Sequence, residues 1–152
     1  MKKYELTKEF KLDLFGQKIF RIKALISFSN VIKGELGGFI GKEENLSHEG
    51  NAWVSGDAKV SGDARVSGNA KVSGNAEVSG DARVSGKVLN IDYEKYNITA
   101  TDNNLKIGCK NYSFEEWWNF TDKEIIAMDG KEALKWWRKW KPILQQILEV
   151  NW

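Results

Sequence analysis

The sequence predicts a mainly β fold, organised around a short solenoid of repeated extended segments and completed by a helical region near its C-terminal end. Three observations predict this fold class. A six-residue pattern recurs without a gap over residues 51–86. Two runs of alternating polar and apolar residues precede it, which favours a β-hairpin. A tryptophan-rich segment with helical spacing follows it.

The repeat reads NAWVSG DAKVSG DARVSG NAKVSG NAEVSG DARVSG. A period of six fits neither a helix nor a coiled coil, whereas alanine and valine two positions apart share one face of an extended segment. The Ser-Gly-Asp/Asn step supplies a bend, because glycine permits positive φ. Three sides of six residues make 18, so each side chain should lie beside the one 18 positions later. The predicted neighbours are Trp53 and Lys71, Lys59 and Glu77, and Arg65 and Arg83.

Residues 60–65, VSGDAR, have the order of an aliphatic residue, a small residue, two variable residues, a small residue and a variable one. This order resembles the hexapeptide signature of the left-handed parallel β-helix, and the resemblance supplies the handedness. The full prediction is therefore a short left-handed parallel β-helix flanked by an N-terminal β-hairpin and a C-terminal helical cap.

Four regions follow from these patterns. We predict an N-terminal β-hairpin region at 1–33, the hexapeptide β-helix at 34–90, a second β-hairpin at 91–112 and a tryptophan-rich α-helical region at 113–152. Local signals mark their turns and helix starts. These signals are bends at 15–17 and around Asp102-Asn103-Asn104, capping boxes at Ser113 with Glu116 and at Thr121 with Glu124, and a helix end near Asp129-Gly130.

The composition narrows the class of protein. The 152 residues include 23 Lys and Arg against 21 Asp and Glu, and 41% are hydrophobic. Near-balanced charge argues against a nucleic-acid coat protein, and no apolar run is long enough to span a bilayer. The single cysteine, Cys109, excludes an internal disulfide and fits a reducing compartment. We expect a cytoplasmic protein without a membrane segment, without a metal site and without a cofactor.

The C-terminal tryptophans admit several interpretations. The apolar spacing over 131–149 favours rings that cover the open end of the solenoid. A partner-binding surface is the main alternative, because Trp and Arg dominate interface hot spots. A membrane-active helix and a surface that stacks on nucleic-acid bases are the others. The predicted partner-binding residues are Trp136, Arg138, Lys139 and Trp140, together with Arg65 and Arg83, which form a small basic patch on the repeats.

One histidine, His48, is the only candidate for acid–base chemistry. It stands just before the repeats, where Glu44 or Glu49 could orient it as a general base. A loop residue with a structural role is the interpretation that we favour, because a lone histidine specifies no reaction. Many proteins with the hexapeptide pattern are acyltransferases that use acyl-coenzyme A and a histidine base. That resemblance implies His48 as the catalytic residue if this chain is such an enzyme.

A second resemblance covers nearly the whole chain. Residues 20–25 (FRIKAL), 34–40 (GELGGFI) and 44–50 (ENLSHEG), the VSGDA repeats and the tail at 107–117 and 136–142 are similar to a family of small hexapeptide-repeat proteins encoded in phages, prophages and bacterial genomes. Some members carry the label of transferases.

This resemblance implies a phage-encoded protein in the host cytosol. The lack of a catalytic constellation and the aromatic, basic C-terminal region favour a non-catalytic protein-binding module. Its expected partner is a host protein or ribonucleoprotein, such as an anti-phage defence nuclease inhibited in the manner of an anti-CRISPR protein. Nucleic acid could contact the basic patches. An acyltransferase and a structural oligomerisation module, which would form a homo-oligomer, are the alternatives.

Overall fold

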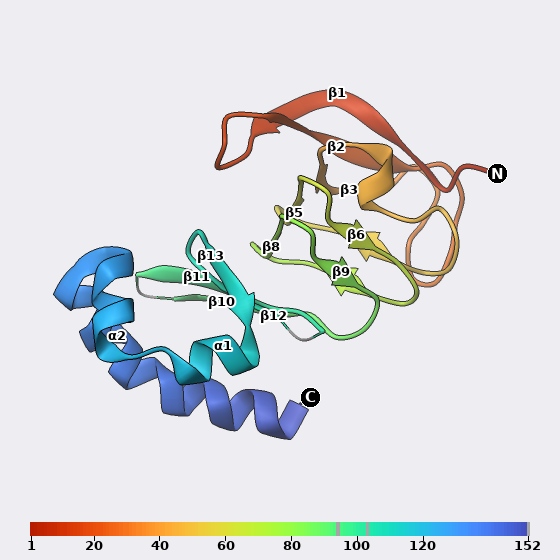
Figure 1. The fold of residues 1–152 in the computed structure, drawn as a ribbon. Coiled ribbons are helices and arrows are strands. Elements are labelled where there is room, and N and C mark those ends of the chain that lie inside the picture. Colours follow the sequence, from red (N-terminus) through yellow and green to blue (C-terminus); the bar gives the residue numbers. More distant parts are fainter. Residues whose placement is uncertain (94, 103, 152) are drawn as a thin grey trace. The chain divides into compact units, whose positions relative to one another are not determined.

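The computed structural model describes residues 1–93, 95–102 and 104–151. The chain divides into two compact units, Met1–Asn111 and Tyr112–Trp152. Figure 1 shows strands throughout the first and helices in the second. Two residues used in the sequence analysis, Asn103 in the second predicted turn and Trp152 at the end of the helical region, lie outside the described residues.

The predicted N-terminal hairpin is confirmed. β1 (Tyr4–Leu12) pairs antiparallel with β2 (Lys18–Ala24). The turn forms because Asp13 Oδ1 accepts hydrogen bonds from the backbone N–H groups of Phe15 (2.8 Å) and Gln17 (2.9 Å), while Gly16 adopts a φ of 77°. β2 pairs antiparallel with β3 (Leu36–Ile40) on its other side.

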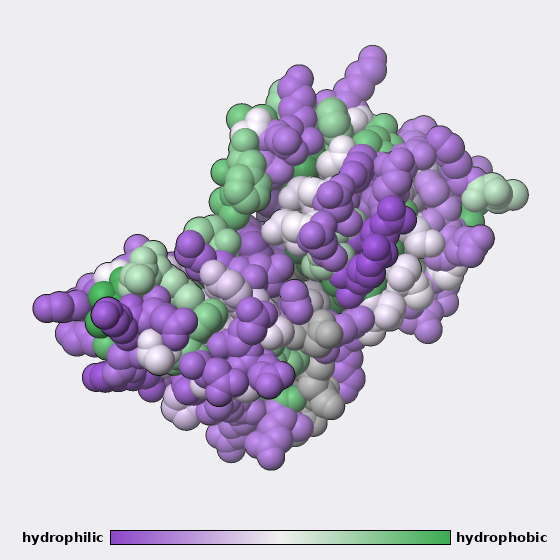
Figure 2. Space-filling view, viewed as in Figure 1, coloured by the Kyte–Doolittle hydropathy of each residue, from purple (hydrophilic) through white to green (hydrophobic). Residues whose placement is uncertain are grey.

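The hairpin carries apolar side chains into solvent at its turn. Figure 2 shows hydrophobic surface over the end of the β1–β2 hairpin. The large apolar residues exposed there are Phe10, Leu12, Leu14 and Phe15.

The repeats form six strands of two residues each, and their predicted 18-residue offset is confirmed. Each strand of the first three repeats pairs in parallel with the strand three repeats later, so that Trp53 lies beside Lys71, Lys59 beside Glu77, and Arg65 beside Arg83. All six repeat valines and the first five repeat alanines are buried, whereas Ala82 is partly buried. The strands are β4 (Trp53–Val54), β5 (Lys59–Val60), β6 (Arg65–Val66), β7 (Lys71–Val72), β8 (Glu77–Val78) and β9 (Arg83–Val84).

The predicted fold class, a left-handed parallel β-helix with a hairpin and a helical cap, is wrong. The molecule is mainly β, but its strands fall into several small sheets of mixed direction. β5 and β8 belong to a five-stranded sheet, β1-β2-β3-β5-β8, that is antiparallel over the hairpin and parallel from β3 onward. β4-β7 and β6-β9 are separate two-stranded sheets. A repeat pattern predicts which repeats pair with each other, but not which flanking strand joins them.

A four-stranded sheet follows the repeats, in the order β10-β11-β12-β13. β10 pairs antiparallel with β11, and β11 with β12, which confirms the strand pair of the second predicted hairpin. Its side chains satisfy backbone donors of the last repeats: Thr99 Oγ1 accepts from Glu77 N–H at 3.1 Å, and Asp102 Oδ2 from Ser85 N–H at 3.2 Å. The strands are β10 (Leu89–Tyr93), β11 (Tyr96–Ala100), β12 (Asn104–Ile107) and β13 (Lys110–Ser113).

The second unit contains α1 (Phe114–Asn119) and α2 (Asp122–Asn151). Both predicted capping boxes are present, with Ser113 and Glu116 before α1 and Thr121 and Glu124 before α2. α2 is interrupted at Asp129 and at Gly130, whose φ is 83°, where the sequence predicts a helix end. The buried rings pack on one another: Trp117 and Trp137 have centroids 5.2 Å apart. No helix in the described part of the chain is both long and apolar enough to cross a membrane.

Candidate partner-binding groove

Three of the residues singled out by the sequence lie together in an open groove of the first unit. The groove has a volume of about 660 Å³ and is lined by His48, Arg65 and Arg83. One wall comes from the short 3-10 helix η1 (Glu43–Asn45) and the loop after it, and the floor from β6 and β9. Asp102 closes the groove beyond the last repeat.

The floor of the groove carries two like charges in register. Arg65 and Arg83 are partners in the parallel pairing of β6 with β9, and both side chains are exposed. Neighbouring strands are about 4.8 Å apart, so the two arginines leave the same face side by side. Neither makes an ion pair or a side-chain hydrogen bond with any residue that the structure describes. Like charges directly beside each other are mildly destabilising, and the nearby carboxylates, such as Asp63, act on them electrostatically but form no ion pair with them.

The carboxylates around the groove are mostly engaged elsewhere. Glu43 pairs with Lys2 at 2.9 Å, and this hydrogen bond lowers the pKa of Glu43. Asp102 accepts from the N–H groups of Ser85 and Gly86, at 3.2 and 3.1 Å. Glu44 is exposed on η1. The groove therefore has a basic floor between acidic rims.

His48 is held by the N-terminal segment rather than poised over the groove. Its Nδ1 accepts a hydrogen bond from the backbone N–H of Lys3 at 3.1 Å, and its ring stacks on Tyr4 with centroids 4.1 Å apart. Burial lowers the pKa of His48, which favours the neutral ring. Because Nδ1 accepts, a neutral His48 carries its proton on Nε2. The lone pair that a general base needs is thus already used within the fold.

A buried lysine that no sequence motif marks anchors the same wall. Lys3 is 1% exposed, and its Nζ donates to the carbonyl oxygen of Ala52 at 2.7 Å. The ammonium also lies over the ring of Phe28, 4.7 Å from its centroid. Burial lowers the pKa of Lys3 from its ordinary 10.5 to about 8. No pattern in the sequence signals this, since Lys2 and Lys3 are adjacent and only one is buried.

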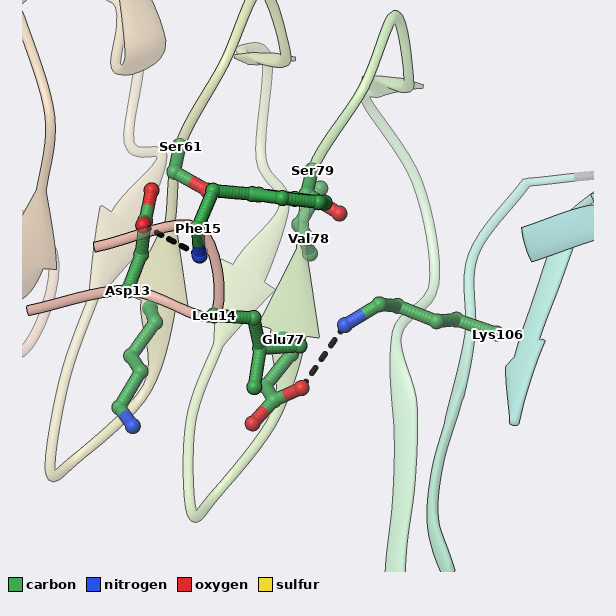
Figure 3. Close-up of a pocket in the computed structure, with 9 residues that line it drawn as sticks. Asp13, Leu14, Phe15, Ser61, Glu77, Val78, Ser79 and Lys106 are labelled. Carbon is green, nitrogen blue, oxygen red and sulfur yellow. Dashed lines mark hydrogen bonds and ion pairs between the residues drawn. The ribbon is translucent and has the colours of Figure 1, made fainter. Parts of the chain in front are cut away.

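On the face formed by β5 and β8 the charged side chains are paired, in contrast to the arginines of the groove floor. Glu77 lies beside Lys59 and pairs with Lys106 at 2.8 Å, and the Lys106 side chain is only 7% exposed. Leu14 and Phe15 of the hairpin turn line a small pocket with these residues (Figure 3). That pocket measures about 20 Å³, which leaves room for little more than a water molecule.

The remaining predicted partner-binding residues lie on α2 in the second unit. Trp136 and Trp140 are each 8% exposed and stack on each other, with centroids 5.7 Å apart. Arg138 is exposed and pairs with Asp122 at 2.6 Å. Lys139 is exposed as well. Their role toward a partner stays a prediction, while their burial makes the two tryptophans part of the packing of this unit.

No known family model and no curated protein matches the chain. Over the residues that the structure describes, no three His, Cys, Asp or Glu side chains gather into a group that could hold a metal ion. Cys109 is exposed and free.

Proposed function

We propose that this protein is a non-catalytic binding module, and that the groove over β6 and β9 receives an anionic part of a macromolecular partner. One observation carries the proposal. Arg65 and Arg83 stand in register on the groove floor and make no ion pair or side-chain hydrogen bond with the described residues, whereas Asp63, Lys71 and Glu77 of the same repeats each have a charged or polar partner. Two neighbouring arginines whose side-chain donors are unused on a concave surface suit an external anion.

The geometry of His48 supports binding over catalysis. A transferase would need a histidine with a free lone pair facing the acyl donor, and Nδ1 already accepts from Lys3. Tyr4 stacking further fixes the ring. The hexapeptide acyltransferase remains the competing function, because His48 does line the groove. It requires the ring to leave its present hydrogen bond.

The partner that we propose is a host protein or ribonucleoprotein in the cytosol. The resemblance of residues 20–25, 34–40 and 44–50 and of the repeats to phage-encoded proteins favours a role in blocking a host defence nuclease, as anti-CRISPR proteins do. A homo-oligomer formed through the same face is the alternative use of the groove.

Capture from a host lysate with three matched variants tests the proposal. Arg65→Glu/Arg83→Glu reverses the groove charge, and Lys23→Glu/Lys33→Glu makes the same net change at two exposed lysines away from the groove. We expect mass spectrometry to find the same partner with the wild type and the lysine control, and to lose it with the arginine variant. Equal capture by all three contradicts the proposal. Saturable acyl-coenzyme A binding that His48→Ala abolishes establishes the transferase instead.

A further inference from the structure

We propose that Arg65 and Arg83 together bind one phosphate monoester group, which specifies the anion that the groove receives. This inference rests on the proposed function and names the ligand chemistry of the same site. It follows from three features of the groove: the spacing of the arginines, the choice of arginine, and the acidic rims.

The spacing suits a single compact anion. Parallel pairing sets the backbones of Arg65 and Arg83 one strand spacing apart, about 4.8 Å. A phosphate whose oxygens lie within about 2.8 Å of each guanidinium spans such a gap. A dianion between the two cations replaces a repulsion with two attractions, so binding is favoured by the same pair that costs the free protein some stability.

The residue type also points to an oxyanion. The position between alanine and valine is lysine, glutamate or tryptophan in the other repeats, and it is arginine only in the two repeats that face the groove. Arginine presents planar donors that bind two oxygens at once, which lysine cannot do. Ser67, two residues beyond Arg65 and also on the groove, adds a hydroxyl that has no other side-chain hydrogen bond to the described residues.

The acidic rims select against extended polyanions. Glu43 and Glu44 stand on one side of the arginines and Asp102 on the other. A chain of carboxylates or a nucleic-acid backbone that runs across the groove would bring further negative charges against these side chains. A terminal phosphate concentrates its charge at the arginines and brings no further negative groups along the acidic rims. The geometry thus favours a phosphate monoester over an acidic peptide or an internal phosphodiester.

Nuclear magnetic resonance titration of the full chain tests the inference. The probes are inorganic phosphate, a nucleoside 5′-monophosphate, a phosphoserine peptide, an oligonucleotide without a terminal phosphate and polyglutamate, all at equal ionic strength. We expect saturable shifts around β6 and β9 with the three monoester-type probes. Arg65→Gln/Arg83→Gln should weaken binding at least tenfold, and Lys23→Gln/Lys33→Gln should leave it unchanged. The nucleotide and the phosphopeptide distinguish the two sources of the same chemical group.

Several outcomes overturn the inference. Phosphate binding that survives Arg65→Gln/Arg83→Gln places the site elsewhere. Binding of polyglutamate or the unphosphorylated oligonucleotide without binding of monoesters rejects the phosphate while leaving the proposed module intact. If the charge-reversal variant loses the partner while the wild type binds no monoester, the phosphate is again rejected and the proposed binding module stands. If the glutamine variant does not fold, Arg65→Lys/Arg83→Lys takes its place. This variant keeps the charge and removes the planar donors of the guanidinium, and we expect it to bind phosphate several-fold more weakly than the wild type.

Discussion

The β5–β8 face and the β6–β9 face are built from the same repeat, yet one is closed and the other open. Glu77 is placed between Lys59 and Lys106 on the first, and the hairpin turn lies over it (Figure 3). Arg65 and Arg83 repeat the same charge on the second, which borders a groove of about 660 Å³. The valines beneath both faces are equally buried. The difference therefore lies in the one variable outward position and in what flanks it.

This contrast separates the residues that build the protein from those available to a partner. Alanine, valine and glycine recur in every repeat and set the spacing of the strands. At some variable positions the side chain contributes to the fold through an ion pair, as Glu77 does, and at others it leaves a charge exposed, as Arg65 does. Substitutions on the β5–β8 face should then lower stability more than binding. Substitutions on the β6–β9 face should lower binding more than stability.

The largest effect should come from breaking the closed face. Glu77→Gln leaves the largely buried ammonium of Lys106 without its carboxylate, and we expect a loss of about 2 kcal/mol in the free energy of unfolding, measured by urea denaturation. Glu49→Gln, at an exposed carboxylate, is the control and should change stability by less than about 0.5 kcal/mol. A second substitution, Lys106→Met, should recover part of the loss. Equal effects of Glu77→Gln and the control would show that the ion pair contributes nothing.

Burial of Lys3 behind the open face should appear in the pH dependence of stability. The folded pKa is about 8 and the unfolded one 10.5, so between these values the unfolded state binds more protons and stability rises with pH. The rise should be on the order of 2 kcal/mol and end near pH 10, where Tyr4, whose pKa is raised by burial, begins to favour the unfolded state. Denaturation curves from pH 7 to 11 measure it.

Lys3→Met provides the check on that assignment. The variant removes the titrating ammonium while keeping an unbranched side chain of similar length. Its stability should no longer rise between pH 8 and 10, and the decline above pH 10 should remain. A rise that persists in Lys3→Met belongs to another group and refutes the burial of this charge.

The sequence predicts local pairing well and long-range pairing poorly, as particular residues show. Periodicity places Arg65 beside Arg83, and capping signals place Ser113 and Thr121 correctly, because both depend on fixed spacings along the chain. The five-stranded sheet could not be predicted in this way, since Phe39 of β3 meets Lys59 of β5 without any repeated spacing.

The candidate site also contains residues that a fixed spacing predicts and residues that only tertiary contacts place. Its arginines follow from the repeat, whereas the wall that holds His48 depends on contacts more than 40 residues apart in the chain. A tertiary hydrogen bond from Lys3 N–H to His48 decides which imidazole nitrogen carries the proton, and no spacing within the sequence encodes it. The wall could therefore be described only from the structure.

Removing the imidazole should have a moderate effect on stability and a much smaller effect on binding than reversing the charge of the two arginines. His48→Ala leaves the Lys3 N–H without its acceptor and removes the stacking on Tyr4, so we expect a loss of about 1–2 kcal/mol. Partner capture per folded molecule should stay far closer to the wild type than that of Arg65→Glu/Arg83→Glu. Preserved stability together with lost function would indicate a chemical role for His48 and would favour the transferase.

The smallest effect on stability is expected on the open face, where the effect on binding is largest. Arg83→Gln removes one of two like charges, so the free energy of unfolding should increase by a few tenths of a kcal/mol at low salt.

The Debye length shrinks to about 3 Å at 1 M salt, so this gain should vanish there, because both arginines are exposed. The loss caused by Glu77→Gln should persist at the same salt, since Lys106 is screened much less. Urea denaturation of both variants at 0.05 and 1 M salt measures the difference. A salt-independent loss for Arg83→Gln would mean that the arginine supports the fold, and the distinction between a face that stabilises and a face that binds would fail.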